Sequence, residues 1–194
     1  ALAEGRYVVR AQDSNGCESA LSSPVEVLVP QEIFFTATPT VCYSGNNDGE
    51  IAVNVSQGNG GYSFSINGGP WLLPAPVNST SYLFQNLTAG TYEINVRDQY
   101  GCSGTPIEVT INPEVLATAT LSTVLTCDDP ALITVTGSGG TGVYAYEWSD
   151  DNGATWNNSN FSGNVFEAAT PGTYRFRVTD ASAGCLADTI GIAV

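Results

Sequence analysis

Apolar and polar residues alternate in short runs along the whole chain. In residues 92–97, Tyr, Ile and Val occupy every second position, with Glu, Asn and Arg between them. Alternation with a period of two is typical of β-strands that bury one face. The same pattern recurs at residues 25–29, 51–55, 62–66, 107–111, 133–135, 144–148 and 174–178. Glycine-rich clusters separate these runs and favour turns. No segment has a sustained helical period, so the sequence predicts an all-β protein.

One motif occurs three times. In its middle copy, Leu-Thr-Ala-Gly-Thr-Tyr at residues 87–92 precedes Asp-Gln-Tyr-Gly-Cys at residues 98–102, and the other two copies end at Cys17 and Cys185. The cysteines of the three copies are therefore 85 and 83 residues apart, a period that indicates tandem domains. We predict complete repeats over residues 31–113 and 114–194. Residues 1–30 would be strands F and G, the C-terminal part of a preceding repeat.

The spacing Leu-x-x-Gly-x-Tyr is that of a tyrosine corner, in which a tyrosine at the start of strand F bonds to the backbone just upstream. We therefore expect structural roles for Tyr7, Tyr92 and Tyr174. The predicted fold is a set of tandem Ig-like or PKD-like Greek-key β-sandwiches in an extended array. Pro30 and Pro113 lie in the short junctions between repeats, where proline restricts the hinge.

Two strands cannot bury a core by themselves, so residues 1–30 need further strands. Two alternatives follow. The chain is a slice of a longer protein whose upstream residues complete the unit, or another molecule completes it by strand donation, which would make the chain a filament subunit.

The charge balance excludes several classes of function. The net charge is −14, with five arginines, no lysine and no histidine. Nucleic acid needs clustered basic residues, so it is excluded as a partner, and anionic membranes are disfavoured for the same reason. The sequence has no run of 18 apolar residues, so we expect no membrane insertion in this segment. Without histidine there is no Ser-His-Asp or Cys-His arrangement, and we expect no catalytic residue and no cofactor-binding residue.

The five cysteines repeat with the domains. Cys42 and Cys127 each precede a strand, whereas Cys17, Cys102 and Cys185 each follow a glycine turn. Regular cysteines in small repeats indicate disulfides in an oxidising compartment. We favour pairing within each repeat, as Cys42–Cys102 and Cys127–Cys185, which leaves Cys17 for an upstream partner. In an Ig-like sandwich the A–B and F–G loops lie at opposite ends, so a disulfide between neighbouring repeats is the rival.

Two loops carry patterns that deserve a functional interpretation. Residues 149–156 match the Asp box Ser-x-Asp-x-Gly-x-Thr-Trp of sialidases, but sialidase chemistry also needs an arginine cluster and a tyrosine nucleophile. We interpret the box as a packed hairpin.

Residues 45–50, Gly-Asn-Asn-Asp-Gly-Glu, have the composition of a calcium loop, but two carboxylates are few for that ion. An Asx-type turn is favoured, with calcium as the alternative cofactor and no other metal expected.

Tryptophan and asparagine offer two further hypotheses. Trp71, Trp148 and Trp156 could form a platform for a surface polysaccharide. Trp148 is in phase with a strand and is expected to face the core, and the other two are expected to pack on hairpins. Several N-x-S/T sequons occur, although such triplets are frequent by chance in a chain rich in Asn and Thr. They include those that begin at Asn54, Asn78, Asn86 and Asn157.

A longer pattern combines residues 42–66 with the Leu-x-Ala-Gly-Thr-Tyr and Asp-x-x-Gly-Cys motifs of residues 87–102. This pattern resembles the SprB-type repeat. In the last repeat Asp128-Asp129-Pro130 replaces the Gly-Asn-Asp-Gly loop, and Ala169 replaces the leucine of the corner. The resemblance implies very large bacterial surface adhesins that are exported by type IX secretion.

Taken together, these patterns predict a non-catalytic spacer or stalk of a secreted bacterial cell-surface adhesin or extracellular filament. The expected partners are other repeats of the same chain, with other copies in a filament or a surface polysaccharide as alternatives. A carbohydrate-binding surface module is the alternative function.

Overall fold

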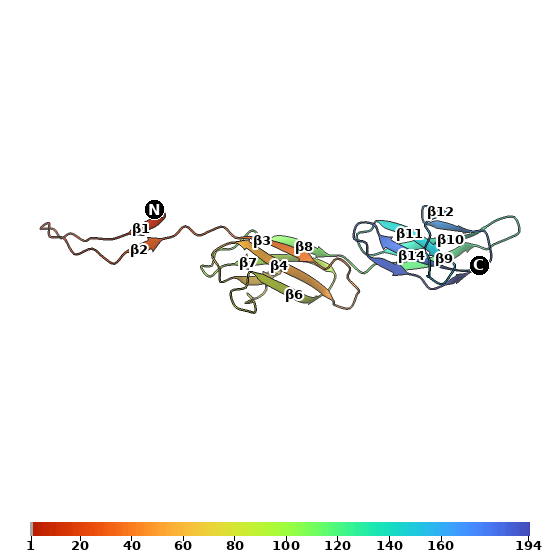
Figure 1. Ribbon diagram of the computed structural model, residues 1–194, viewed down its shortest axis with the longest axis horizontal. Helices are drawn as coiled ribbons and strands as arrows, with labels where there is room; N and C mark the ends of the chain where they lie inside the picture. The colour runs from red at the N-terminus through yellow and green to blue at the C-terminus, as the bar shows by residue number, and fades with distance from the viewer. Residues whose placement is uncertain (1) are drawn as a thin grey trace.

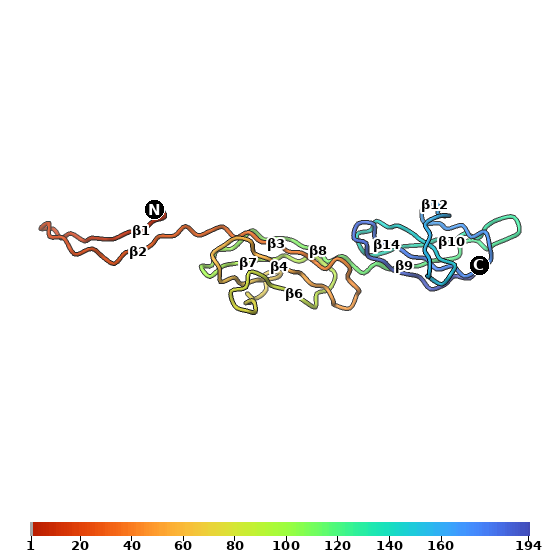
Figure 2. Tube along the Cα trace, in the orientation of Figure 1, coloured from red at the N-terminus to blue at the C-terminus, as the bar shows by residue number. Residues whose placement is uncertain are grey.

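A computed structural model describes residues 2–194. The chain forms a thin two-stranded ribbon followed by two β-sandwiches arranged end to end along one axis (Figures 1 and 2). All regular elements of the described residues are strands, as the alternating pattern predicts. The extended array therefore has three consecutive parts, which correspond to the three copies of the motif.

The ribbon consists of β1 (Gly5–Tyr7) and β2 (Val25–Val27), which pair antiparallel with Tyr7 opposite Val25. The register is that of strands F and G in the next repeat, where Tyr92 lies opposite Val109. No third strand of residues 2–194 pairs with this ribbon. Its side chains are therefore largely exposed.

The first sandwich, the middle repeat, has two three-stranded sheets. One has the order β3-β4-β6 and the other β5-β7-β8. The bounds are β3 (Phe34–Pro39), β4 (Gly49–Gln57), β5 (Ser63–Ile66), β6 (Ser81–Leu87), β7 (Gly90–Arg97) and β8 (Ile107–Ile111). These strands correspond to A-B-E and C-F-G of an Ig-like sandwich.

The second sandwich, the last repeat, has the same plan with a four-stranded sheet β12-β13-β10-β9 opposite a sheet of β11, β14, β15 and β16. The order is that of strands D-E-B-A and C-F-G in a constant-type Ig domain. The bounds are β9 (Leu116–Thr123), β10 (Ala131–Ser138), β11 (Tyr144–Ser149), β12 (Phe161–Ser162), β13 (Val165–Ala168), β14 (Thr173–Asp180), β15 (Leu186–Asp188) and β16 (Ile192–Ala193).

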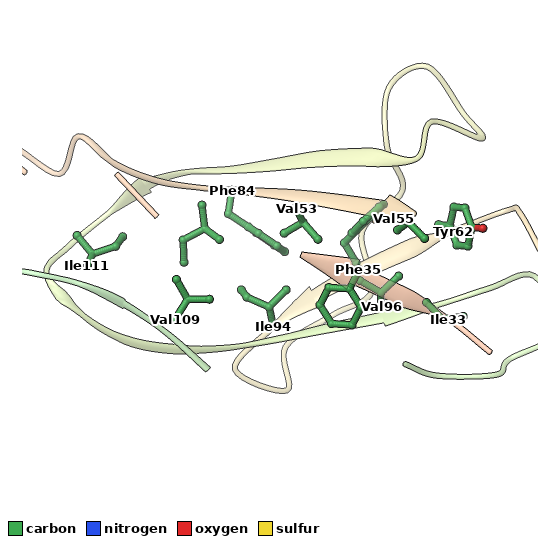
Figure 3. Close-up of a cluster of buried hydrophobic side chains, with 12 residues drawn as sticks. Ile33, Phe35, Val53, Val55, Tyr62, Phe84, Ile94, Val96, Val109 and Ile111 are labelled. Atoms are coloured by element: carbon green, nitrogen blue, oxygen red, sulfur yellow. The ribbon is translucent and has the colours of Figure 1, made fainter. Parts of the chain in front are cut away.

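Each sandwich buries its own core between its two sheets. In the middle repeat, Ile51, Val53, Phe64, Ile94 and Val96 are fully buried. Figure 3 shows Val53, Ile94 and Val96 in the space between the two sheets. The last repeat has an equivalent core around Ile133, Val135, Phe166, Phe176 and Val178. The inward residues are those of the alternating pattern, because every second side chain of a strand points to the same face.

Among residues 2–194 there is no helix that is long and apolar enough to cross a membrane.

Candidate functional site: the junction between the two sandwiches

The two sandwiches meet at a short linker that is fixed at both ends. Strand β8 ends at Ile111, which is fully buried in the core of the middle repeat, and Val115 is buried in the core of the last repeat. Between them, the carbonyl oxygen of Pro113 accepts a hydrogen bond of 2.8 Å from the backbone N–H of Gly140. The linker therefore has little freedom to act as a hinge.

Two glycines of the loop between β10 and β11 allow the backbones to come this close. Gly139 and Gly140 have φ values of 77° and 54°, in the left-handed region that favours glycine. A Cβ atom on Gly139 would collide with the backbone carbonyl of Glu114. This carbonyl cannot move away without moving the linker, so the close approach requires glycine.

A disulfide crosses the same junction. Cys42, in the loop between β3 and β4 of the middle repeat, is bonded to Cys185, which follows β14 in the last repeat. Their Cα atoms are 5.4 Å apart, and 143 residues separate them in the sequence. The Sγ atom of Cys185 also lies 3.3 Å from the carbonyl oxygen of Val41, which is a contact and not a hydrogen bond because the bonded sulfur has no proton.

The prediction of disulfides within each repeat, Cys42–Cys102 and Cys127–Cys185, is therefore wrong, and the rival pairing between neighbouring repeats is the one found. Among the described cysteines, Cys17, Cys102 and Cys127 are not bonded. The reason is topological. Strand A runs away from the F–G end of its own sandwich, so its A–B loop lies at the opposite end, next to the F–G turn of the following repeat.

An aspartate shapes the turn that presents Cys185. The carboxylate of Asp180 is buried and accepts hydrogen bonds from the backbone N–H and side-chain hydroxyl of Thr141 and from the backbone N–H groups of Ser182 and Ala183. These bonds, those from Thr141 above all, lower the pKa of Asp180 from 3.8 to about 2. The ionised carboxylate thus holds the F–G turn onto the glycine loop that contacts the linker.

A related aspartate turn, one residue shorter, occurs in the other two copies of the motif. The backbone N–H of Cys102 donates to Asp98 at 3.0 Å, and that of Cys17 donates to Asp13 at 2.8 Å. From the sequence, these aspartates were assigned no role beyond marking the period. Their recurrence three or four residues before each Gly-Cys pair was the signal, since Asp favours turns by bonding nearby N–H groups.

The three tyrosines predicted to form corners all bond to the backbone four residues upstream. The hydroxyl of Tyr7 donates to Ala3 at 2.8 Å, and those of Tyr92 and Tyr174 donate to Thr88 and Thr170 at 2.9 Å. Only Tyr174 is buried. These bonds fix the E–F turn at the downstream end of each unit, opposite the end with the F–G cysteine.

The Asp box forms a compact hairpin turn, as interpreted from the sequence. Asp151 accepts hydrogen bonds from the hydroxyls of Ser149 and Thr155 at 2.7 and 2.6 Å and from the N–H of Thr155. These bonds, led by the Thr155 hydroxyl, lower the pKa of Asp151 well below 3.8. All the partners belong to the turn itself, so the carboxylate is occupied in holding the hairpin.

The tryptophans are covered by neighbouring side chains. Trp148 packs against Phe166 with ring centroids 5.1 Å apart, which is the inward position expected from the strand pattern. The guanidinium of Arg177 lies 4.0 Å from the ring centre of Trp156, and Arg97 lies 4.4 Å from that of Trp71. An arginine on the indole face occupies the surface on which a sugar would stack, so the two half-buried rings do not form a free platform.

The candidate calcium loop is closed by its own backbone. Asp48 accepts a hydrogen bond of 3.1 Å from the N–H of Ser44, and the hydrogen bonds with Ser44 lower the pKa of Asp48. Within residues 2–194 no group of three or more His, Cys, Asp or Glu side chains is placed to hold a metal ion. The sequon asparagines Asn54, Asn78, Asn86 and Asn157 are all exposed.

Comparison with known proteins supports the resemblance found in the sequence. Two segments of the chain match the SprB repeat. The family model covers residues 35–70, from strand β3 to the turn after β5, and residues 128–153, from the loop before β10 into the Asp box. This confirms the predicted resemblance, and SprB repeats belong to surface proteins. A search of curated proteins finds no match.

Solved structures similar to the chain have Ig-like domains. The C-terminal 282-residue fragment of intimin, solved in complex with the intimin-binding domain of the translocated intimin receptor, has a TM-score of 0.54 and 13% identity. The match covers 86% of this chain and 64% of the intimin fragment, so the chain spans less than two thirds of it. The ectodomain of mouse nectin-like molecule 4 has a TM-score of 0.39 and 14% identity, over 87% of this chain and 68% of that one. The likeness to intimin confirms the all-β, Ig-like fold class.

Proposed function

We propose that this chain is a non-catalytic spacer or stalk segment of a secreted bacterial cell-surface adhesin, in which stapled repeats hold a binding end away from the cell. The match to SprB repeats supports a surface protein, and the disulfide fits an extracellular location. The end-to-end arrangement of the two sandwiches in Figure 1 makes the chain long and thin, which supports a role as a spacer.

The observation that carries the proposal is the disulfide across the junction. Tension that enters along β3 reaches Cys42 directly, passes through the sulfur atoms to Cys185, and leaves along the strands that follow it. The strands between the two cysteines then lie outside the path of the force. A spacer benefits from this arrangement, because small sandwiches are only marginally stable by themselves.

The two-stranded ribbon favours a second candidate, a filament subunit that assembles by strand donation. Val9 is 64% exposed, whereas its counterpart Ile94 is fully buried, and Val25 is 59% exposed, whereas its counterpart Val109 is 6% exposed. These apolar side chains favour completion by strands from outside residues 2–194. Light scattering separates the two candidates. Strand donation would give oligomers whose mass grows with protein concentration, and Val9→Asp would dissociate them into single chains.

Immunoelectron microscopy of intact cells tests the stalk. Antibodies against the purified chain should place gold particles outside the cell and at a distance from its surface. Deleting residues 31–113 in frame from the whole protein removes one period and should bring the particles closer to the surface without abolishing adhesion. Label confined to the cell interior, or adhesion lost together with this one repeat, would contradict the proposal.

A further inference from the structure

The junction upstream of the middle repeat has one half of a disulfide site. Cys102 holds the same place as Cys185: each follows the glycine of an F–G turn, and each turn is fixed by an aspartate. Cys102 lines an open hollow of about 830 Å³ together with Glu4 and Glu26 of the ribbon and with Pro30 of the linker. At the next junction, the hollow beside Cys185 is also lined by residues of the A–B loop that contains Cys42.

The downstream end of the last repeat has the complementary half. Cys127 lies in the A–B loop, at the position that Cys42 occupies in the middle repeat, and its side chain is exposed. The hydroxyl of Thr126 accepts hydrogen bonds from the N–H groups of Asp128 and Asp129, at 3.3 and 2.9 Å, and thus fixes the turn that presents Cys127. An open hollow of about 370 Å³ adjoins it.

We propose that Cys127 is half of a second disulfide between repeats, and that its partner is the F–G cysteine of another repeat of this fold docked at the downstream end. Cys102 is the matching half toward a repeat docked upstream. The argument rests on equivalence within one chain, since the same pair of positions is bonded where both are present, at Cys42 and Cys185. The inference holds whatever the array is used for.

The bond forms by oxidation of two thiols. Each thiol loses a proton, and the pair transfers two electrons to a disulfide oxidant such as oxidised glutathione, which leaves as two reduced glutathione molecules. Cys102 lies in the F–G turn at the upstream end of the middle sandwich, and Cys127 lies in the A–B loop at the downstream end of the last sandwich, so a single chain cannot join them to each other. A second repeat is therefore the occupant that fits, because it supplies both a preformed Asp-Gly-Cys turn and the matching linker.

A series of such bonds would give overlapping rings. The ring closed by Cys42 and Cys185 contains Cys127, so a bond from Cys127 to the next repeat would start inside this ring and end outside it. The last repeat would then be tied to both neighbours, and residues 127–185 would belong to two rings at once. This arrangement leaves no junction of the array without a covalent crosslink.

The test is a tandem chain in which a second copy of residues 112–194 follows Val194 directly. The register supports this fusion, because Val194 exchanges backbone hydrogen bonds with Gly172 as Ile111 pairs with Gly90. The protein is folded in glutathione buffer, alkylated and digested, and its disulfide-linked peptides are identified by mass spectrometry. Both copies give the same peptides, so loss of a Cys127–Cys185 peptide pair in the first-copy variant Cys127→Ser assigns the pair to Cys127 of the first copy. We expect a bond between Cys127 of the first copy and Cys185 of the appended copy.

The count of free thiols gives a second readout. The single chain has three unbonded cysteines, and the tandem should also have three if the new bond forms and two more if it does not. Cys127→Ser in the first copy should free the appended Cys185 and leave Cys42–Cys185 intact, which also shows that the sandwiches have folded. A tandem that forms Cys42–Cys185 but leaves Cys127 free, or pairs it with Cys17 or Cys102, would overturn the inference.

Discussion

Removing the disulfide should change how far the chain extends under force. The double variant Cys42→Ser, Cys185→Ser opens the ring without leaving a reactive thiol at the junction. The ring encloses the chain between Cys42 and Cys185, a separation of 143 residues. At about 3.4 Å per extended residue, this corresponds to roughly 490 Å of chain that tension cannot reach while the bond is intact. The disulfide does not shorten the folded array, because the two Cα atoms that it links are already only 5.4 Å apart in the folded state.

Single-molecule pulling with handles at the two ends of the chain measures this difference. The native chain should unfold to a contour length set by the 50 residues of separation that lie outside the ring (193 less 143), about 170 Å. The double variant should reach about 660 Å, and so should the native chain after reduction with dithiothreitol. Cys17→Ser should behave as the native chain, because Cys17 is not in the bond. Equal contour lengths for the oxidised native chain and the double variant would refute the proposed path of force.

Three further changes test the turns of the last repeat. Tyr174→Phe removes a buried hydroxyl that donates to the backbone, and we expect it to lower the free energy of unfolding by about 1 kcal/mol in urea titrations. Asp180 has a lowered pKa in the folded state, so its contribution to stability is complete above pH 3.8 and is lost as the pH falls toward 2. We therefore expect Asp180→Asn to destabilise the protein at pH 7. The thermal midpoint of this variant should also fall less steeply than that of the native chain between pH 4 and pH 2. Gly139→Ala should destabilise the protein more than Gly142→Ala, because both glycines have positive φ values but only the first would collide with the carbonyl of Glu114.

Each of these expectations has a result that would contradict it. An unchanged urea midpoint for Tyr174→Phe would show that the hydroxyl bond contributes nothing net. A thermal midpoint that still falls as steeply between pH 4 and pH 2 in Asp180→Asn would assign the acid sensitivity to other carboxylates. Equal costs for the two alanine variants would mean that backbone strain alone, and not contact with the linker, explains the need for glycine at Gly139.

The strands and the tyrosine corners could be predicted because their signals are local. Tyr92, Ile94 and Val96 face the core because alternate side chains of any strand share a face. The hydroxyl of Tyr92 reaches a carbonyl only four residues upstream, so its spacing from the leucine and glycine of the motif suffices to place it. The inward position of Trp148 followed from the same reasoning.

The disulfide partners could not be chosen in the same way, because they depend on how two repeats stack. Cys42 lies closer in sequence to Cys102 than to Cys185, and loop length alone favours the shorter closure. The covering of Trp71 and Trp156 by arginines was also missed. It requires the register between strand F and the C–D hairpin, which the pattern of single strands does not contain.

The geometry of a sandwich explains why the cysteines serve the junction and not the repeat. A disulfide needs Cα atoms within about 7 Å, and the A–B and F–G loops of one sandwich are separated by the length of its strands. A strand of eight residues such as β7 spans about 26 Å, so Cys42 and Cys102 cannot meet without unfolding the repeat. The same opposition brings Cys42 beside the F–G turn of the next repeat. Cysteines at these two loops are therefore suited only to joining one repeat to another, as the proposed stalk requires.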